Sequence, residues 1–129
     1  MNIVLWILQV LLAAQFLQHG LIMVFPPEEY VEIMNAAFGV GLRYFIGIAE
    51  LLAVLGLLLP GLLRMYTRLL LLTFAGLMIV TASASVYHVS RGETGMAMYT
   101  AVLFIIISFA GYMRWKIKPI LPRTSQLSA

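Results

Sequence analysis

Four long apolar runs restrict the folds that this chain can adopt. They cover about residues 3–25, 43–59, 65–89 and 96–114. A helix needs roughly 20 apolar residues to cross the hydrocarbon core of a bilayer, and each run reaches or approaches that length. Because lipid offers no hydrogen-bond partners, a crossing segment must satisfy its backbone groups internally, as an α-helix does. The sequence therefore predicts an all-α integral membrane protein, a four-helix bundle within residues 1–118.

The composition agrees with a membrane environment. Of the 129 residues, 63% are hydrophobic and 10% are charged, whereas soluble domains carry roughly 25% charged residues. The chain has no cysteine, which excludes disulfides, thiol relays and iron–sulfur clusters ligated by this chain. The basic residues form no long run, so we expect the lipid bilayer and not nucleic acid to be the partner.

The segments between the runs predict how the helices are connected. Residues 27–38 read "PEEYVEIMNAAF", with apolar and acidic residues on opposite faces. This pattern predicts a short helix that lies in the membrane interface between the first two spans. "LPG" at residues 59–61 and "SRGETG" at residues 90–95 predict turns. Residues 119–129 are polar and interrupted by proline, and they predict a flexible cytoplasmic tail.

The basic residues also predict the orientation of the chain. With four crossings, both termini lie on one side of the membrane. Six of the eight Lys and Arg residues fall on that side. The positive-inside rule therefore places both termini in the cytoplasm. These six residues are Arg64, Arg68, Arg114, Lys116, Lys118 and Arg123.

Polar residues inside the apolar runs indicate where a functional site lies. A carboxylate such as Glu50 is costly within a membrane unless it faces other polar groups. At 1.5 Å of rise per residue, Glu50 and His19 lie at similar depths. We therefore expect a polar pocket in the outer half of the bundle, where Glu50 is paired with His19, Arg43 or a glutamine. The candidate ligand-binding or proton-exchange residues are Glu50, His19, Arg43, Gln15, Gln18, His88 and Tyr99.

Each candidate also has a purely structural interpretation. Glu50 could form a buried pair that only fixes the register of two helices, and Arg43 could extend to the interface. His88 and Tyr99 suit the ends of membrane helices. His19 and His88 lie on different helices, so a haem between them is a further alternative. Metal-ligand spacing such as His-x-x-x-His is absent, so no metal site is expected.

Three segments of the chain resemble a known family. They are "RYFIGIAELLAVLGLLLPG" (43–61), "SVYHVSRGE" (85–93) and "GYMRWKIKP" (111–119). Together they are similar to the DoxX-like family of small four-helix bacterial membrane proteins. Arg43, Gly47 and Glu50 form the most specific part of the match. The resemblance implies a four-helix bundle in the bacterial inner membrane and an association with quinone-linked membrane oxidoreductase systems.

Three functions stay open at this point. The first is a component of a quinone-linked oxidoreductase, in which His19, Glu50 and Tyr99 contact the quinone and a redox partner protein supplies electrons. The second is binding or proton-coupled transport of a small amphipathic molecule, with Glu50 as its counter-charge. The third is a structural membrane subunit without chemistry. No intrinsic cofactor is evident, and neither the enzyme status nor a homo-oligomer is decided by the sequence.

Overall fold

A computed structural model describes residues 2–123 as an all-helical chain. The elements are α1 (Asn2–Val24), α2 (Glu28–Phe38), α3 (Val40–Leu63), α4 (Thr67–Ser90), α5 (Thr94–Tyr112) and η1 (Met113–Ile117). The last of these is a single π-helical turn that continues α5. No strand occurs within residues 2–123. The predicted all-α bundle with a short helix between the first two long helices is therefore confirmed.

Four helical segments are long and apolar enough to cross a membrane. They are α1, α3, α4 and the continuous segment Thr94–Ile117, each with 23 or 24 residues. At 1.5 Å per residue such a helix is about 35 Å long, which exceeds the roughly 30 Å of hydrocarbon in a bilayer. Large apolar side chains such as Phe45, Leu72 and Ile105 are exposed on the outside of the bundle. Lipid, and not water, suits such a surface.

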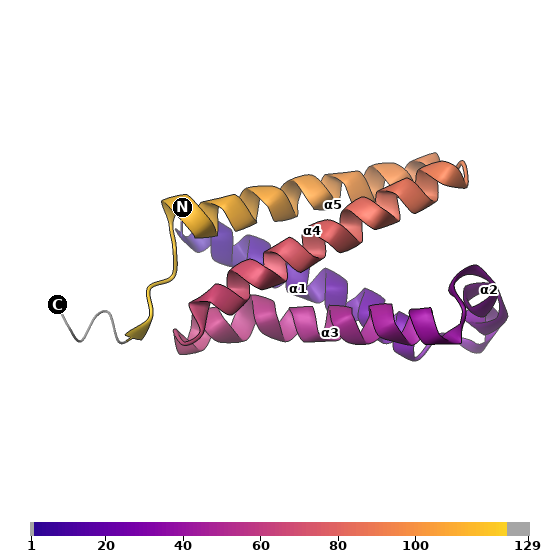
Figure 1. Ribbon diagram of the computed structural model, residues 1–129, viewed down its shortest axis with the longest axis horizontal. Helices are drawn as coiled ribbons and strands as arrows, with labels where there is room; N and C mark the ends of the chain where they lie inside the picture. The colour runs from indigo at the N-terminus through magenta and orange to yellow at the C-terminus, as the bar shows by residue number, and fades with distance from the viewer. Residues whose placement is uncertain (1, 124–129) are drawn as a thin grey trace.

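The long helices pack mainly as two pairs, α1 on α3 and α4 on α5. The start of α1 and the end of α5 lie at one end of the bundle, while α2 and the turn between α4 and α5 lie at the other (Figure 1). We call these the terminal end and the α2 end. A core cluster between the pairs joins all four long helices; it consists of Leu12, Ala13, Phe16, Leu57, Leu70, Phe74, Leu77, Ile107 and Ala110.

The helix α3 is longer than the predicted run 43–59. It continues through Pro60 and Gly61 to Leu63, where the sequence predicted a turn. A proline inside a helix removes one backbone hydrogen bond, but membrane helices tolerate this when neighbouring helices pack around it. Pro60 and Gly61 are buried. A Cβ at Gly61 would lie 2.7 Å from Trp6 of α1, so α1 closes tightly over this last part of α3.

The turn between α3 and α4 lies at the terminal end. Arg64 and Tyr66 adopt positive φ angles of 54° and 51° there, a conformation that is uncommon for residues other than glycine. The start of the predicted tail packs on this turn, because the Arg123 amide donates to the Arg64 carbonyl at 3.0 Å. Arg64 Nε in turn donates to the Leu121 carbonyl. The rest of the predicted tail, residues 124–129, lies outside the described residues.

Candidate functional site

Glu50 and His19 form a hydrogen-bonded pair between α3 and α1. His19 Nδ1 lies 2.6 Å from Glu50 Oε2. The Glu50 side chain is 3% exposed, whereas the His19 side chain is 50% exposed. The carboxylate is therefore enclosed by the bundle, and the imidazole connects it to the bundle surface. Of the three partners expected for Glu50, the structure selects His19.

Two glycines allow α1 and α3 to approach closely beside this pair. A Cβ at Gly47 would lie 2.7 Å from Val24 Cγ2 and 2.9 Å from Met23 Cβ. A Cβ at Gly20 would lie 3.1 Å from the Gly47 carbonyl oxygen. Small residues at such crossings let membrane helices pack backbone against backbone. This close approach brings the His19 ring within hydrogen-bonding distance of Glu50.

Arg43 is buried but does not pair with Glu50. Its Nε donates to Asn35 Oδ1 of α2 at 2.9 Å, and its Nη1 donates to the Met23 carbonyl near the end of α1. The seven-residue spacing does place Arg43 and Glu50 on one face, but roughly 10 Å apart along the axis. Carbonyls in the last turn of a helix lack intrahelical partners. The guanidinium satisfies one of these and ties α2 to the α1–α3 pair.

The two glutamines near His19 do not join the pair. Gln15 is half-buried and Gln18 is exposed, and neither side chain forms a hydrogen bond within residues 2–123. The buried face of α1 runs instead through Leu5, Gln9, Leu12, Ala13, Phe16, Gly20 and Met23. Gln15 and Gln18 are therefore not part of the buried face of α1, and of these two glutamines and His19 only His19 bonds to α3.

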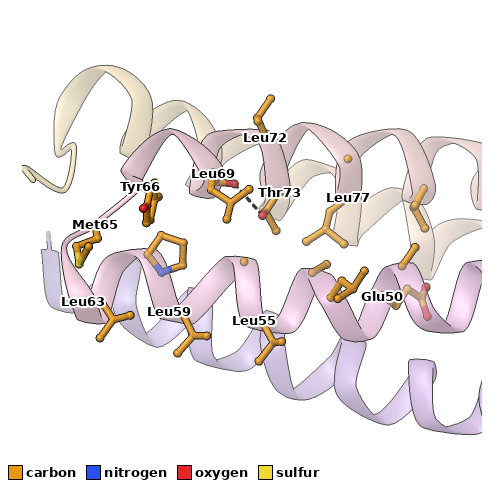
Figure 2. A pocket seen from close by; sticks show the side chains of 17 residues that line it. Glu50, Leu55, Leu59, Leu63, Met65, Tyr66, Leu69, Leu72, Thr73 and Leu77 are labelled. Carbon is orange, nitrogen blue, oxygen red and sulfur yellow. Dashed lines mark hydrogen bonds between the residues drawn. The ribbon is translucent and has the colours of Figure 1, made fainter.

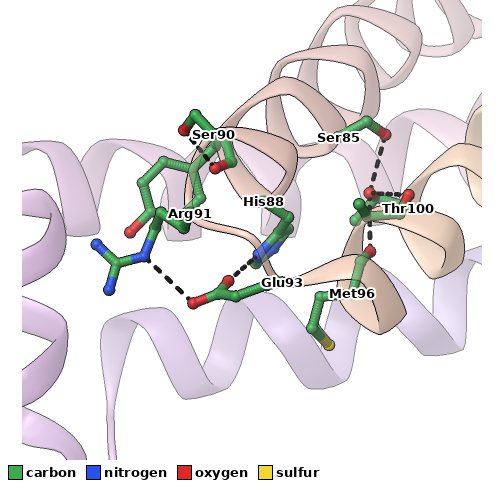
Figure 3. A network of polar contacts seen from close by, with 9 residues as sticks. Ser85, His88, Ser90, Arg91, Glu93, Met96 and Thr100 are labelled. Carbon is green, nitrogen blue, oxygen red and sulfur yellow. Dashed lines mark hydrogen bonds and ion pairs between the residues drawn. The ribbon is translucent and has the colours of Figure 1, made fainter.

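A second polar cluster lies between α4 and α5 at the α2 end (Figure 3). Ser85 Oγ lies 2.8 Å from Thr100 Oγ1. Nearer the turn, His88 Nδ1 lies 2.5 Å from Glu93 Oε2, and Arg91 Nε donates to Glu93 Oε1 at 3.2 Å. The His88 side chain thus connects the end of α4 to Glu93 in the turn that leads to α5.

The charges in this turn influence one another. Hydrogen bonds from His88 first, and from Arg91 second, lower the pKa of Glu93 below its ordinary value. The hydrogen bond to Glu93 raises the pKa of Arg91. Tyr99, which we expected in a shared pocket, is 43% exposed. These contacts stabilise a turn and do not by themselves form a ligand site.

The polar side chains therefore do not line one shared pocket. No hydrogen bond links the His19–Glu50 pair to the α4–α5 cluster in the part of the chain that the structure describes. The helices pack as pairs, and the His19–Glu50 and Ser85–Thr100 contacts each lie within one pair. His19 and His88 are bonded to different glutamates in different clusters. The expected polar pocket in the outer half is thus replaced by two separate polar clusters.

An apolar groove with a volume of about 690 Å³ lies between α3 and α4. We call it the α3–α4 groove. It runs from Glu50 near the middle of α3 to Met65 and Tyr66 at the terminal end (Figure 2). It therefore occupies the terminal half of the bundle and not the half that contains α2. Its other lining residues are mostly leucine, alanine and glycine.

Small residues line this groove. Gly56 faces Thr73, and a Cβ at Gly56 would lie 2.1 Å from Thr73 Oγ1. Gly76 lines the groove as well, and a Cβ there would meet no atom within 4 Å. The Thr73 hydroxyl donates to the Leu69 carbonyl of its own helix, so it does not offer its proton to a ligand. Glu50 is the one ionisable carboxyl group that lines the groove.

The groove and the ion pair together define the candidate functional site. An apolar channel that opens at the bundle surface suits a lipophilic molecule. A carboxylate paired with an imidazole can hydrogen-bond a polar head group and exchange protons with it. No group of three or more His, Cys, Asp or Glu side chains positioned for a metal ion occurs within residues 2–123.

Sequence reasoning missed the walls of the groove and a buried network at the terminal end. The groove depends on which faces of α3 and α4 meet, and leucine-rich runs do not specify that. The network involves Gln9 and Arg114, which are 0% and 2% exposed. A glutamine within the leucine-rich start of α1 was a usable signal, because a buried amide requires a partner.

Comparison with models of protein families matches residues 7–111 to the DoxX-like family. The match covers most of the chain and includes His19, Arg43, Glu50 and His88. No curated protein and no solved structure shows significant similarity to the chain.

Proposed function

This chain belongs to the DoxX-like family, and on that premise we propose that it binds a quinone as the membrane component of a quinone-linked oxidoreductase. The observation that supports this proposal is the apolar α3–α4 groove, which Glu50 lines near the middle of α3; the Glu50 side chain is buried and bonded to His19. A quinone combines an apolar chain with a ring that accepts hydrogen bonds. Its chain fits the groove, and its ring lies at the Glu50 end.

The His19–Glu50 pair supplies the proton chemistry in this proposal. Reduction of a quinone to a quinol takes up electrons and protons in equal number. His19 is half-exposed and bonded to the enclosed Glu50, so a proton can pass from the surface through the imidazole to the carboxylate. The chain has no cysteine for a thiol or iron–sulfur relay. A redox partner protein therefore delivers the electrons.

A photoreactive quinone analogue tests whether the groove is the binding site. We expect it to cross-link to α3 and α4 in the full chain reconstituted in nanodiscs. A Cβ at Gly76 would meet no atom within 4 Å, so Gly76→Leu should extend a side chain into the groove and reduce cross-linking at least about tenfold, since several apolar contacts of the ligand are displaced. Gly95→Leu is the matched control, because Gly95 has equally open surroundings but does not line the groove.

Glu50→Gln and His19→Gln test the head-group end of the site. Each removes a charge-assisted hydrogen bond, which is worth roughly 1.5–3 kcal/mol, so binding should weaken by about tenfold or more. Quinol formation in membranes that contain the chain should fall in parallel. Binding and quinol formation that persist in both variants and in Gly76→Leu would refute the proposal.

Proton-coupled binding or transport of a small lipophilic cation is the second candidate. The enclosed carboxylate favours it, because Glu50 can act as counter-charge for a cation in an otherwise apolar groove. Cation uptake into liposomes that rises with a proton gradient, and is lost in Glu50→Gln, would favour this function. If Glu50→Gln changes only the stability of the chain, the protein is a structural subunit.

A further inference from the structure

Arg114 at the terminal end is a buried cation without a buried anion beside it. It lies in the π-helical turn η1 and is 2% exposed. Its Nε donates to Gln9 Oε1 at 2.6 Å, and its Nη1 donates to Asn2 Oδ1 at 2.6 Å and to the Lys118 carbonyl at 3.2 Å. All of these acceptors are neutral. The guanidinium carbon also lies 5.4 Å from the centroid of the Trp6 ring, but no carboxylate within residues 2–123 pairs with the positive charge.

One nitrogen of this guanidinium lacks a hydrogen-bond partner among the described residues. Arg114 Nη2 is buried and forms no hydrogen bond with the described residues. The acidic residues of the chain lie elsewhere: Glu28, Glu29 and Glu32 are in α2, Glu93 is at the α2 end, and Glu50 is paired with His19. A buried donor without an acceptor is costly, and an uncompensated buried charge costs more. Both costs disappear if an external anion binds here.

A small hollow of about 70 Å³ lies next to Arg114. It offers more space than a single water molecule needs. Thr67, Arg68, Arg114 and Trp115 contribute to its wall. Arg68 is exposed and forms no ion pair within residues 2–123. Two arginines and a threonine are thus among the residues that line the hollow.

The beginning of α4 adds a third source of positive potential. Thr67 and Arg68 are the first residues of this 24-residue helix, and no side chain caps its N-terminus. Uncapped N–H groups and the helix dipole favour an anion at this position. Residues of the first turn of α4 and the buried Arg114 line the same hollow, so two independent features favour the same kind of ligand there.

We propose that this hollow binds a phosphate group, with Arg114 and Arg68 as its charged ligands. A planar guanidinium suits a tetrahedral oxyanion, because its parallel N–H groups match two of the oxygens. The site lies at the ends of the spans, which is the depth of lipid phosphates, and basic pockets between membrane helices bind anionic lipid head groups. The phosphate group belongs either to such a lipid or to free inorganic phosphate.

The experiment measures thermal unfolding of the full chain in maltoside micelles, which contain no phosphate. Phosphatidylglycerol is titrated in one arm and inorganic phosphate in the other, against chloride at equal ionic strength. We expect at least one of them to raise the unfolding midpoint by several degrees. A rise with phosphatidylglycerol alone identifies a lipid ligand, which native mass spectrometry should detect bound to the chain. A rise with inorganic phosphate identifies a free anion.

Three variants decide whether the effect belongs to this site. Arg68→Gln changes an exposed side chain and should weaken binding several-fold without loss of folding. Arg114→Lys keeps the charge but loses the planar geometry, and it should weaken binding about tenfold. Arg123→Gln is the matched control, since it removes the same charge at the same end but does not line the hollow. The proposal would be overturned if neither ligand raised the unfolding midpoint. It would also be overturned if Arg123→Gln weakened binding as much as Arg68→Gln and Arg114→Lys do.

Discussion

Individual polar residues in this chain are satisfied by local partners. Glu50 bonds to His19, Arg43 to Asn35 and a carbonyl of α1, and His88 to Glu93. Within a membrane an unpaired polar group is costly, so each such residue identifies a place where two elements must meet. The residue types and their approximate depth were readable from the sequence. The partner of each residue was not, because spacing along one helix contains no information about the facing helix.

The turn between α4 and α5 provides a pH prediction at the residue scale. The hydrogen bond from His88 is the main cause of the lowered Glu93 pKa, and Arg91 contributes further. The folded-state pKa lies below the unfolded value, so the stabilisation is complete above the ordinary carboxyl pKa and is lost as the pH falls through the lowered one. An NMR titration of the Glu93 carboxyl carbon should therefore give a pKa below the ordinary value.

Replacement of the histidine tests the cause of this shift. His88→Gln should move the pKa of Glu93 upward, towards its ordinary value. Tyr99→Phe serves as a control, because Tyr99 is exposed on the outside of α5 and its substitution should leave the titration unchanged. A Glu93 titration that is identical in wild type and His88→Gln would show that the imidazole does not hold this carboxylate.

At the scale of the helices, packing follows the small residues. Gly20 and Gly47 set the distance between α1 and α3, Gly56 brings α3 against Thr73, and Gly111 lies against Phe74. The predicted number and order of the helices agree with the structure, since length and hydropathy decide them. The end of α3 differs, because tight packing of Gly61 against Trp6 outweighs the local tendency of Pro60 to end a helix.

The contact between α1 and α3 gives a prediction with a control in the same helix. Gly47→Ala should lower the free energy of unfolding by about 1–3 kcal/mol, because its Cβ would overlap Met23 and Val24. Gly41→Ala meets no neighbour within 4 Å, and it should be neutral or stabilise by up to about 1 kcal/mol through helix propensity. Unfolding in mixed detergent micelles measures the change in the free energy of unfolding for both variants. Equal changes in Gly47→Ala and Gly41→Ala would mean that Gly47 is not a close contact.

At the scale of the whole molecule, charge is distributed unevenly between the two ends of the bundle. The acidic helix α2 lies at one end, and most of the basic residues lie at the other. We propose on this basis that both termini face the cytoplasm of a bacterial cell, as the positive-inside rule predicts. The phosphate site inferred for Arg114 would then lie in the cytoplasmic leaflet.

Because the chain contains no cysteine, single cysteines can report this orientation directly. Ser90→Cys lies at the α2 end and Met65→Cys in the turn between α3 and α4, and both positions are exposed. A membrane-impermeant maleimide should label Ser90→Cys on spheroplasts and Met65→Cys only in inverted vesicles. The cysteine-free chain controls for background labelling, and the reverse pattern would mean that the termini face outward.

The sequence alone determined that this chain crosses a membrane four times, because hydrocarbon accepts only long apolar helices with satisfied backbones. It also identified Glu50 as a carboxylate that needs a partner. Only the tertiary structure decided that this partner is His19, that an apolar groove lies between α3 and α4, and that Arg114 is buried among neutral groups. Hydropathy reflects the free energy of transferring each segment from water into lipid. The contacts, in contrast, depend on which faces of the helices meet.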